Sequence, residues 1–127
     1  MTKRELIIAA KKIAIKYGSS NRCISGDVGA ALKTKTGKIY IGINIDCACG
    51  IGFCAEHSAI SSMLLNQESE IEMIVAVNCK GKIIPPCGRC RELIYAIDRK
   101  NLKANIIISK TETIKLSKLL PLRWQEY

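Results

Sequence analysis

Aromatic side chains are scarce in this sequence of 127 residues, of which Phe, Trp and Tyr make up only 5%. The core must therefore be mostly aliphatic, in a chain that is 48% hydrophobic and hence globular rather than disordered. No stretch approaches the ~20 apolar residues that a membrane-spanning helix needs. Internal repeats, linkers and low-complexity tracts are also missing, so we expect a single domain over residues 1–127.

The sequence shows no secretory signal, because its first apolar run is too short for the hydrophobic segment of one. We therefore expect a cytoplasmic protein, whose thiols stay reduced. The net charge of +9 could attract nucleic acid. The lysines are scattered, however, and they do not alternate with aromatic residues as in single-strand binders. This favours an ordinary basic surface, with neither nucleic acid nor a membrane as the expected partner.

The spacing of apolar residues predicts alternating strands and helices. Thr2 and Glu5 form a capping-box pattern, and the helical spacing that follows continues through Tyr17 to a stop at Gly18. Two β-rich runs around a short Gly-containing connection predict a hairpin. Further helices are expected from Cys54 and after Pro86, with buried strands over 72–78 and 104–109 and a short helical turn near the end. This order predicts an α/β sandwich with a mixed sheet.

Seven cysteines are many for this length, and an odd number in a reducing compartment indicates metal binding or catalysis rather than a disulfide framework. Cys87 and Cys90 have the spacing C-x-x-C at a predicted helix start, where residues three apart lie on one side. Cys54 also opens a predicted helix, and helix N-termini stabilise thiolates. Three thiolates would leave one position of a tetrahedral Zn²⁺ open for water, as in catalytic sites.

Glu56 follows Cys54 by two residues, so it can point into the same site without binding the metal. A ligand-x-Glu motif followed by P-C-x-x-C is the signature of zinc deaminases, in which the Glu moves protons. Other interpretations remain for the cysteines. Cys87 and Cys90 could be a redox pair, or Cys47 or Cys49 could complete a structural four-cysteine zinc site.

The cysteines outside the motifs have simpler explanations. We expect Cys23 and Cys79 to be plain buried thiols. Cys47 and Cys49 lie in the Gly- and Cys-rich loop before the helix of Glu56, where they either line a pocket or serve packing.

On these motifs the chain resembles the cytidine deaminase family, specifically its small all-cysteine zinc nucleoside deaminases, which include blasticidin-S deaminases. The matching pieces, in family order, are VGAAL at 28–32, Asn44, CAE at 54–56, PCGRCRE at 86–92 and LLP at 119–121. The resemblance implies a three-layer αβα sandwich with a mixed five-stranded sheet. It also implies a Zn²⁺ cofactor and a homotetramer.

The resemblance further implies roles for individual residues. Asn44 would bind the sugar with Asp46, and Trp124 would reach the base in a neighbouring subunit's site. Backbone carbonyls near Ala55 and Pro85 would accept the amino group. Simpler alternatives are a strand-end turn residue for Asn44 and an interface or core anchor for Trp124.

Three positions depart from the family pattern. Gly26 stands where the family usually has Phe, Asp46 replaces a Glu, and His57 replaces an Arg that bonds to the thiolates. His57 could still donate to a thiolate or be an ordinary helix residue, and Arg89 and Arg91 could also offset the negative charge of a Cys₃ zinc site.

The expected function is zinc-dependent hydrolytic deamination of a cytosine nucleoside, converting cytidine or deoxycytidine to uridine or deoxyuridine plus ammonia, as in pyrimidine salvage. A cytosine nucleoside antibiotic such as blasticidin S is the alternative substrate. Two more distant alternatives are a nucleic-acid deaminase, favoured by the charge, and a zinc module without activity.

Overall fold

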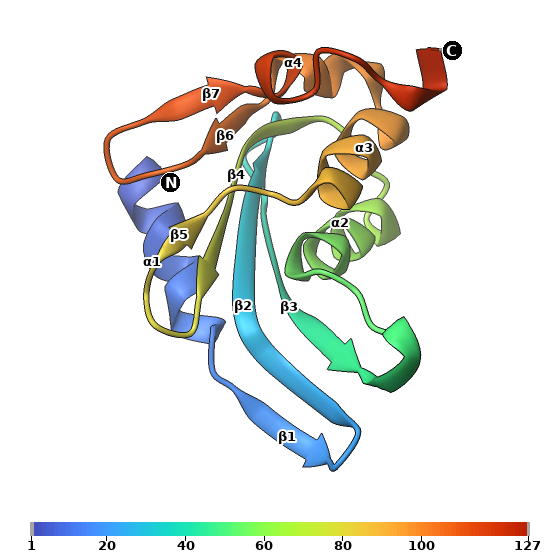
Figure 1. Ribbon diagram of the computed structural model, residues 1–127. Helices are drawn as coiled ribbons and strands as arrows, with labels where there is room; N and C mark the ends of the chain where they lie inside the picture. The colour runs from blue at the N-terminus through green and yellow to red at the C-terminus, as the bar shows by residue number, and fades with distance from the viewer. Residues whose placement is uncertain (1, 127) are drawn as a thin grey trace.

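The structure, a computed structural model, describes residues 2–126 and has helices on both faces of a central sheet (Figure 1). Helix α1 covers one face, while α2 and α3 cover the other. The elements are α1 (Lys3–Ile13), β1 (Tyr17–Ser20), β2 (Cys23–Thr34), β3 (Ile39–Cys47), η1 (Ala48–Gly50), α2 (Ala55–Leu65), β4 (Ile71–Asn78), β5 (Ile83–Ile84), α3 (Gly88–Ile97), η2 (Arg99–Lys103), β6 (Asn105–Ile107), β7 (Thr113–Lys115), α4 (Leu116–Leu119) and η3 (Trp124–Glu126). This confirms the predicted αβα sandwich.

The sheet is mixed, as predicted, but it has seven strands rather than five. Its main path is β1-β2-β4-β6-β7, with β3 paired to β2 and β5 paired to β4. Strands β4 and β6 are parallel, and the other named pairs are antiparallel. The extra strands are short pieces of two to four residues, too brief to show an alternating pattern in the sequence.

Helix α1 begins as predicted but ends early. The Thr2 side chain accepts from the Glu5 backbone, and the Glu5 side chain accepts in return from Thr2, which completes the capping box. The helix stops at Ile13, so the expected continuation to Gly18 is wrong. Tyr17 instead lies opposite Ser25 in the β1–β2 ladder, where strand pairing outweighs the helical spacing.

Strand β2 contributes to the apolar clusters on both faces of the sheet, because successive side chains along a strand point to opposite faces. Ala30 and Leu32 join the larger apolar cluster under α2 and α3, and Ala31 joins the smaller cluster under α1. No helix within residues 2–126 has both the length and the apolar character to cross a membrane.

Gly42 sets how closely α2 approaches the sheet. A Cβ at this position would lie 2.4 Å from the Ala59 backbone nitrogen, which is closer than atoms can pack. The missing side chain therefore lets α2 rest directly on β3. This contact places the first turn of α2 against the end of β3.

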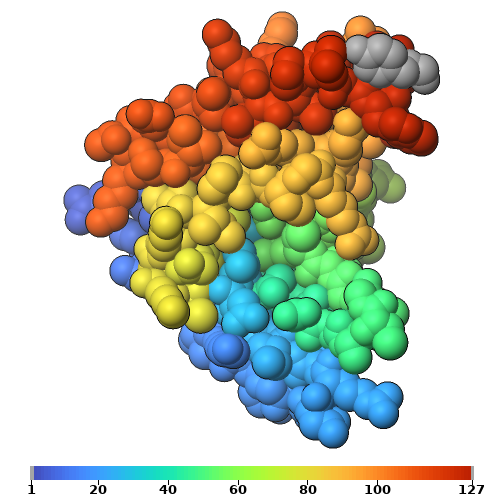
Figure 2. All heavy atoms as spheres, in the orientation of Figure 1, coloured from blue at the N-terminus to red at the C-terminus, as the bar shows by residue number. Residues whose placement is uncertain are grey.

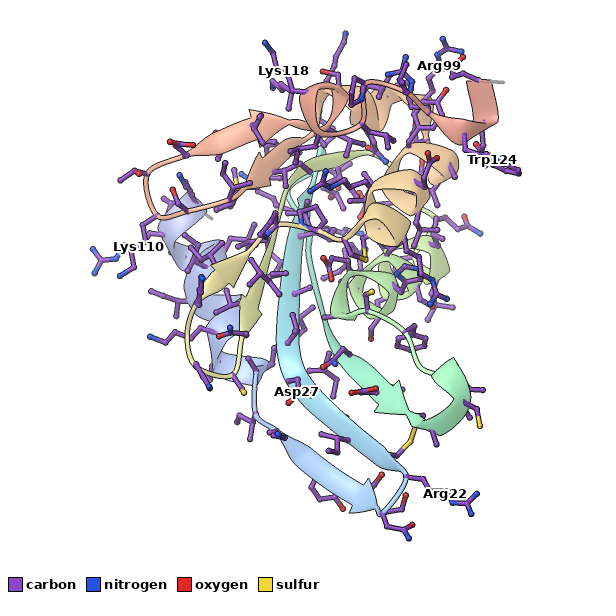
Figure 3. All side chains as sticks on the ribbon, in the orientation of Figure 1. Arg22, Asp27, Arg99, Lys110, Lys118 and Trp124 are labelled. Carbon is purple, nitrogen blue, oxygen red and sulfur yellow. A yellow bond between two sulfur atoms is a disulfide. The ribbon has the colours of Figure 1, made fainter. Side chains whose placement is uncertain are left out.

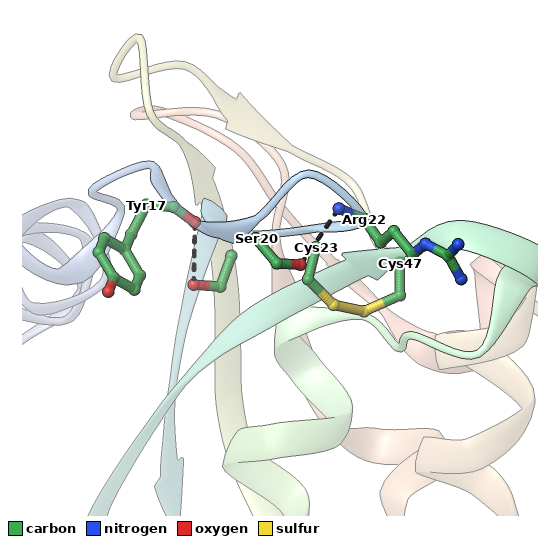
Figure 4. Close-up of a disulfide and its surroundings, with 6 residues drawn as sticks. Tyr17, Ser20, Arg22, Cys23 and Cys47 are labelled. Carbon is green, nitrogen blue, oxygen red and sulfur yellow. Dashed lines mark hydrogen bonds between the residues drawn. A yellow bond between two sulfur atoms is a disulfide. The ribbon is translucent and has the colours of Figure 1, made fainter.

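The far end of the β2–β3 hairpin is closed by a disulfide between Cys23 and Cys47 (Figure 4). The two residues are register partners with Cα atoms 4.4 Å apart. The expectation that Cys23 is a plain buried thiol is therefore wrong. Cys79 is also not buried but exposed, as is Cys49. Antiparallel register brought Cys23 and Cys47 together across 24 positions of sequence, which no local pattern reports.

Candidate metal centre and active site

A cavity of about 310 Å³ opens between β3, the start of α2 and the segment that leads into α3. Figure 2 shows its mouth as a hollow where these three parts of the surface meet. The volume falls in the range of small-molecule sites. Its lining residues are Val28, Asn44, Ile45, Asp46, Cys47, Gly50, Gly52, Phe53, Cys54, Ala55, Glu56, Ile84, Pro85 and Cys87.

Three cysteines meet beside this cavity because two helices begin there. Cys54 is the N-cap of α2 and Cys87 is the N-cap of α3, while Cys90 lies in the first turn of α3. The Sγ atoms of Cys54 and Cys87 are 3.4 Å apart, and those of Cys87 and Cys90 are 3.6 Å apart. The structure thus brings together all three cysteines that the motifs singled out.

The three sulfurs fit a tetrahedral zinc ion. With Zn–S bonds of ~2.3 Å, two thiolates on one tetrahedral ion lie about 3.8 Å apart. Burial raises the pKa of the Cys90 thiol far above its usual range, with the Glu56 carboxylate adding to the effect. Burial also raises the pKa of Cys54. A divalent cation would offset the cost of ionising these buried thiols, because it favours the thiolate form of each ligand.

Cys87 differs from its two neighbours. Burial acts to raise the pKa of this thiol too, but the Cys90 backbone N–H and the two neighbouring thiols outweigh it, so the net shift is downward. Cys87 is therefore the thiol of the three that ionises most readily, at the start of a helix where amide groups favour negative charge.

Glu56 is only 5% exposed and lies in the first turn of α2, where it lines the cavity. Burial raises the pKa of its carboxyl group, while its own backbone N–H and the Cys90 thiol partly oppose the shift. A buried carboxyl group with a raised pKa in a cavity is a candidate for taking up and passing on protons.

His57 lies against the cysteines rather than on the open surface. Its Nδ1 atom is 3.5 Å from the Cys90 Sγ atom, and its ring stacks on Phe53 at an interplanar angle of 11°. Burial lowers the pKa of His57, and the nearby Arg89 charge adds to this. Cys54, His57 and Cys90 also offer ligand atoms within 4.8 Å of one another, so they form a second possible metal set.

Three of the four predicted substrate residues line the cavity of this chain. Asn44 and Asp46 lie on β3, and Ala55 faces them from α2. The Asn44 Oδ1 atom accepts from the Val28 backbone N–H at 3.0 Å, which fixes the orientation of the carboxamide. This bond bridges the irregular register between Ser25 and Gly29 in β2.

Gly26 explains one departure from the family pattern. Its φ is +79°, and a Cβ there would lie 1.9 Å from the Ile15 carbonyl oxygen. A phenylalanine therefore does not fit at this position. Phe53, the only phenylalanine in the chain, lines the cavity instead, and the sequence signal for it was its place directly before Cys54.

Arg91 has contacts that the sequence did not predict. Its guanidinium donates to the backbone carbonyls of Pro86 at 2.8 Å and Leu119 at 3.1 Å, so it grips the main chain rather than a thiolate. Arg89 is exposed and acts on the site through its charge on His57.

Trp124 projects from the outer surface beside α3 and is 77% exposed (Figure 3). Among the described residues, the cavity lining of this single chain does not include it. Its backbone N–H donates to Glu92 at 2.9 Å, which holds the C-terminal segment against α3. The labelled basic residues Arg22, Arg99, Lys110 and Lys118 project from different parts of the surface in the same view.

The sequence matches a known family over most of its length. The family model for the cytidine and deoxycytidylate deaminase zinc-binding region matches residues 2–105. Blasticidin-S deaminase of Bacillus cereus is 36% identical over 102 residues, which cover 72% of this chain and 70% of that protein. Cytidine deaminase of Halalkalibacterium halodurans is 31% identical over 97 residues, covering 74% of each chain.

The fold also matches solved structures. Cytidine deaminase from Mycobacterium leprae superposes with a TM-score of 0.79 at 27% identity, covering 96% of this chain and 99% of that one. The likeness therefore extends past the matched family region to nearly the whole chain.

Proposed function

The chain belongs to the cytidine and deoxycytidylate deaminase zinc-binding family, and we propose from this that it is a zinc-dependent hydrolase that deaminates cytidine or deoxycytidine. The products are uridine or deoxyuridine and ammonia, as in pyrimidine salvage. One observation carries the proposal. The sulfurs of Cys54 and Cys90 lie 3.4 and 3.6 Å from the sulfur of Cys87, in a cluster whose Cys54, Cys87 and buried Glu56 line a small-molecule cavity.

We assign Cys54, Cys87 and Cys90 as the Zn²⁺ ligands. The spacing of their sulfurs suits a tetrahedral ion, and a three-ligand set leaves one position open. His57 is better placed as a partner of the Cys90 sulfur, because its stacked ring is held against Phe53. Zinc bound at these ligands supplies a Lewis acid that makes water a nucleophile near neutral pH.

Glu56 moves the protons in this proposal. Its carboxylate takes a proton from the attacking water and delivers it to the ring nitrogen N3 of the substrate. It then takes the remaining proton from the hydroxyl group newly added at C4 and passes it to the amino group, so that the C4–N bond breaks, the C4 carbonyl forms and ammonia leaves. Burial favours the protonated form of this carboxyl group, so it accepts a proton from water more readily than an exposed carboxylate does.

The remaining cavity residues would bind and orient the nucleoside. Asn44, held by Val28, presents its carboxamide to the sugar, and Asp46 offers a shorter acidic partner on the same strand. The backbone at Ala55 and Pro85 lies at the cavity for the amino group. The family usually has an aromatic residue at the position of Gly26. In this chain Phe53 supplies an aromatic side chain to the cavity lining instead.

Blasticidin S is the second candidate substrate. The 36% identity to the Bacillus cereus blasticidin-S deaminase supports it as an alternative to cytidine and deoxycytidine. This antibiotic is a cytosine nucleoside as well, so the same metal centre and Glu56 would act on it. The two substrates would differ only in their contacts with the cavity walls around the part of the molecule outside the cytosine ring.

Assembly and location complete the proposal. We assign a homotetramer in which Trp124 reaches a neighbouring site, supported by its 77% exposure and by the exposed apolar side chains of Ile51, Leu65 and Leu122. A cytoplasmic location is supported by the five free cysteines, whereas the Cys23–Cys47 disulfide runs against the expectation that every thiol stays reduced. Sedimentation and cell fractionation test these two parts.

The central experiment is an ultraviolet deamination assay on cytidine, deoxycytidine and blasticidin S, with guanine and a cytosine oligonucleotide as further substrates and with zinc content measured on the same sample. Glu56→Gln is expected to keep zinc and lose ~10²- to 10⁴-fold in turnover. Glu112→Gln, at an exposed position, is the matched control and should keep the wild-type rate. A Glu56→Gln variant with a near-normal rate, or a wild-type protein that holds zinc and releases no ammonia, would contradict the proposal.

A further inference from the structure

The Arg91 guanidinium holds the main chain directly before Cys87. Its Nε donates to the Pro86 carbonyl at 2.8 Å. After Cys87 the chain is held by the helix itself, because the Arg91 backbone N–H makes the ordinary i→i−4 bond to the Cys87 carbonyl at 3.0 Å. Pro85 and Pro86 have no N–H groups, so this segment has fewer ways to be held by ordinary backbone bonds.

The other arm of the same guanidinium reaches a different part of the chain. Its Nη1 donates to the Leu119 carbonyl at 3.1 Å, at the last residue of α4. Neighbouring residues of α3 extend this contact with the C-terminal segment: Glu92 accepts from the Trp124 N–H at 2.9 Å, and Arg123 lies 5.5 Å above the Tyr95 ring. The C-terminal segment thus rests on the helix that carries Cys90.

The contrast with Cys54 shows why an arginine is needed at Cys87. Before Cys54, Phe53 pairs with Ile45 through two backbone bonds of 2.9 and 3.0 Å, so strand pairing fixes that cysteine. The segment before Cys87 leaves strand β5 after Ile84 and has no such pairing at Pro86. The Arg91 side chain therefore restrains the segment before Cys87, whereas backbone pairing restrains the segment before Cys54.

We propose that Arg91 is a positioning residue that fixes the Cys87 thiol for zinc and couples the metal centre to the C-terminal segment. The inference rests on the proposed function, because it takes Cys87 as a ligand. The planar guanidinium is essential to it, since two donors at a fixed angle reach Pro86 and Leu119 at once. A lysine keeps the charge but has one terminal nitrogen.

The test compares Arg91→Lys and Arg91→Met with wild type in the full-length, zinc-loaded protein. The matched control is Arg4→Lys, an exposed arginine of α1 on the other face of the sheet. Zinc affinity is measured by competition with a chromophoric chelator. Both Arg91 variants should bind zinc ~10- to 100-fold more weakly, as is typical when a residue that orients a ligand is lost. Arg4→Lys should match wild type.

Two readouts separate positioning from a general loss of stability. With Co²⁺ in place of zinc, the visible bands should shift in Arg91→Lys, because the Cys87 ligand has moved. Amide exchange over residues 116–126 should be faster in Arg91→Lys, and removing zinc should speed it in wild type more than in this variant, since coupling is reciprocal. Circular dichroism confirms folding, and Arg91→Lys decides the test if Arg91→Met is unfolded.

An Arg91→Lys protein with wild-type zinc affinity, an unchanged Co²⁺ spectrum and unchanged exchange would overturn the inference. That result would leave the proposed function intact. A wild-type protein that binds no zinc would instead overturn the proposed function, and with it the role of Cys87 on which this inference depends.

Discussion

Two groups of cysteines lie within the same small region and have different chemistry. At the metal centre, the sulfurs of Cys54, Cys87 and Cys90 are free, with spacings of 3.4 and 3.6 Å between neighbours. At the end of the β2–β3 hairpin, Cys23 and Cys47 are joined in a disulfide. Cys47 also lines the cavity, so both groups border the site.

The difference is one of backbone geometry. Cys23 and Cys47 face each other across an antiparallel ladder with Cα atoms 4.4 Å apart, which falls at the short end of the range for a disulfide. The other three stand at the starts of two helices, where their sulfurs point at a common centre but stay well beyond the ~2.05 Å of an S–S bond. Residue type alone therefore does not decide whether a cysteine binds metal or crosslinks.

The largest effect is expected when the two groups of cysteines are treated separately, one with a metal chelator and the other with a reductant. A strong chelator should lower turnover by more than about 100-fold, since outer partners of a metal alone contribute 10- to 100-fold. Adding zinc back should restore the rate. A phosphine reductant opens the disulfide without offering thiolates that compete for the metal, and it should leave zinc content unchanged. Loss of stoichiometric zinc on mild reduction would show that the two groups are not independent.

Within the metal centre, single substitutions separate ligands from partners. Cys87→Ser should abolish stoichiometric zinc binding, whereas His57→Gln should weaken it by ~10- to 100-fold, because His57 contacts the Cys90 sulfur from outside the ligand set that we propose. Metal analysis after gel filtration measures both. If His57→Gln lost zinc entirely and Cys87→Ser kept it, the alternative set of Cys54, His57 and Cys90 would be correct.

At the hairpin, the double variant Cys23→Ser/Cys47→Ser should unfold more easily by about 3 kcal/mol, the chain-entropy value for the 24-residue separation. Zinc content should be unaffected. Urea unfolding measures the change in free energy, with Cys79→Ser, an exposed free cysteine, as the control that should stay close to wild type. Equal stability of the double variant and wild type would show that the crosslink adds nothing.

The smallest expected effect is on stability at Glu68, which contacts neither group of cysteines. Thr36 and Tyr40 donate to the Glu68 carboxylate, and chiefly the Thr36 bond lowers the pKa of this group. A lowered folded-state pKa stabilises the protein above the unfolded value of about 4.3, and that gain is lost as the pH falls through the folded value.

Glu68→Gln should therefore lose less stability than wild type when urea unfolding is repeated at pH ~5 and pH ~3, because only the wild type has this carboxylate to protonate. Zinc release at low pH affects both proteins alike and cancels in the difference. The same pH dependence in both proteins would mean that Glu68 is not a source of acid sensitivity.

The sequence predicted which cysteines lie together at the proposed metal centre better than it predicted the strand pairings, for a physical reason. Cys54, Glu56 and the Cys87–Cys90 pair each lie in the first turn of a helix, so short spacings along the chain set their arrangement. That the starts of these two helices lie next to each other was then expected from the family resemblance. The αβα layers likewise followed from strands and helices that are long enough to show a period.

What the sequence missed depends on contacts between distant residues. The Cys23–Cys47 disulfide depends on hairpin register, and Tyr17 left its helical pattern to pair with Ser25. Arg91 was expected near the thiolates, but a long side chain takes its partners from the surrounding fold, here two carbonyls 33 residues apart in sequence at Pro86 and Leu119. Single-chain sequence patterns carry no signal for any of these.

The bare backbone at Gly42 links the width of the cavity to the packing of the core. Strand β3 carries Asn44 and Asp46 on one side of the cavity, and α2 carries Ala55 and Glu56 at its start. A Cβ at Gly42 would lie 2.4 Å from the Ala59 backbone nitrogen, so any side chain there would have to push α2 away from β3. A substitution at this position, which is not itself in the cavity lining, would therefore disturb the relative placement of the residues on both elements.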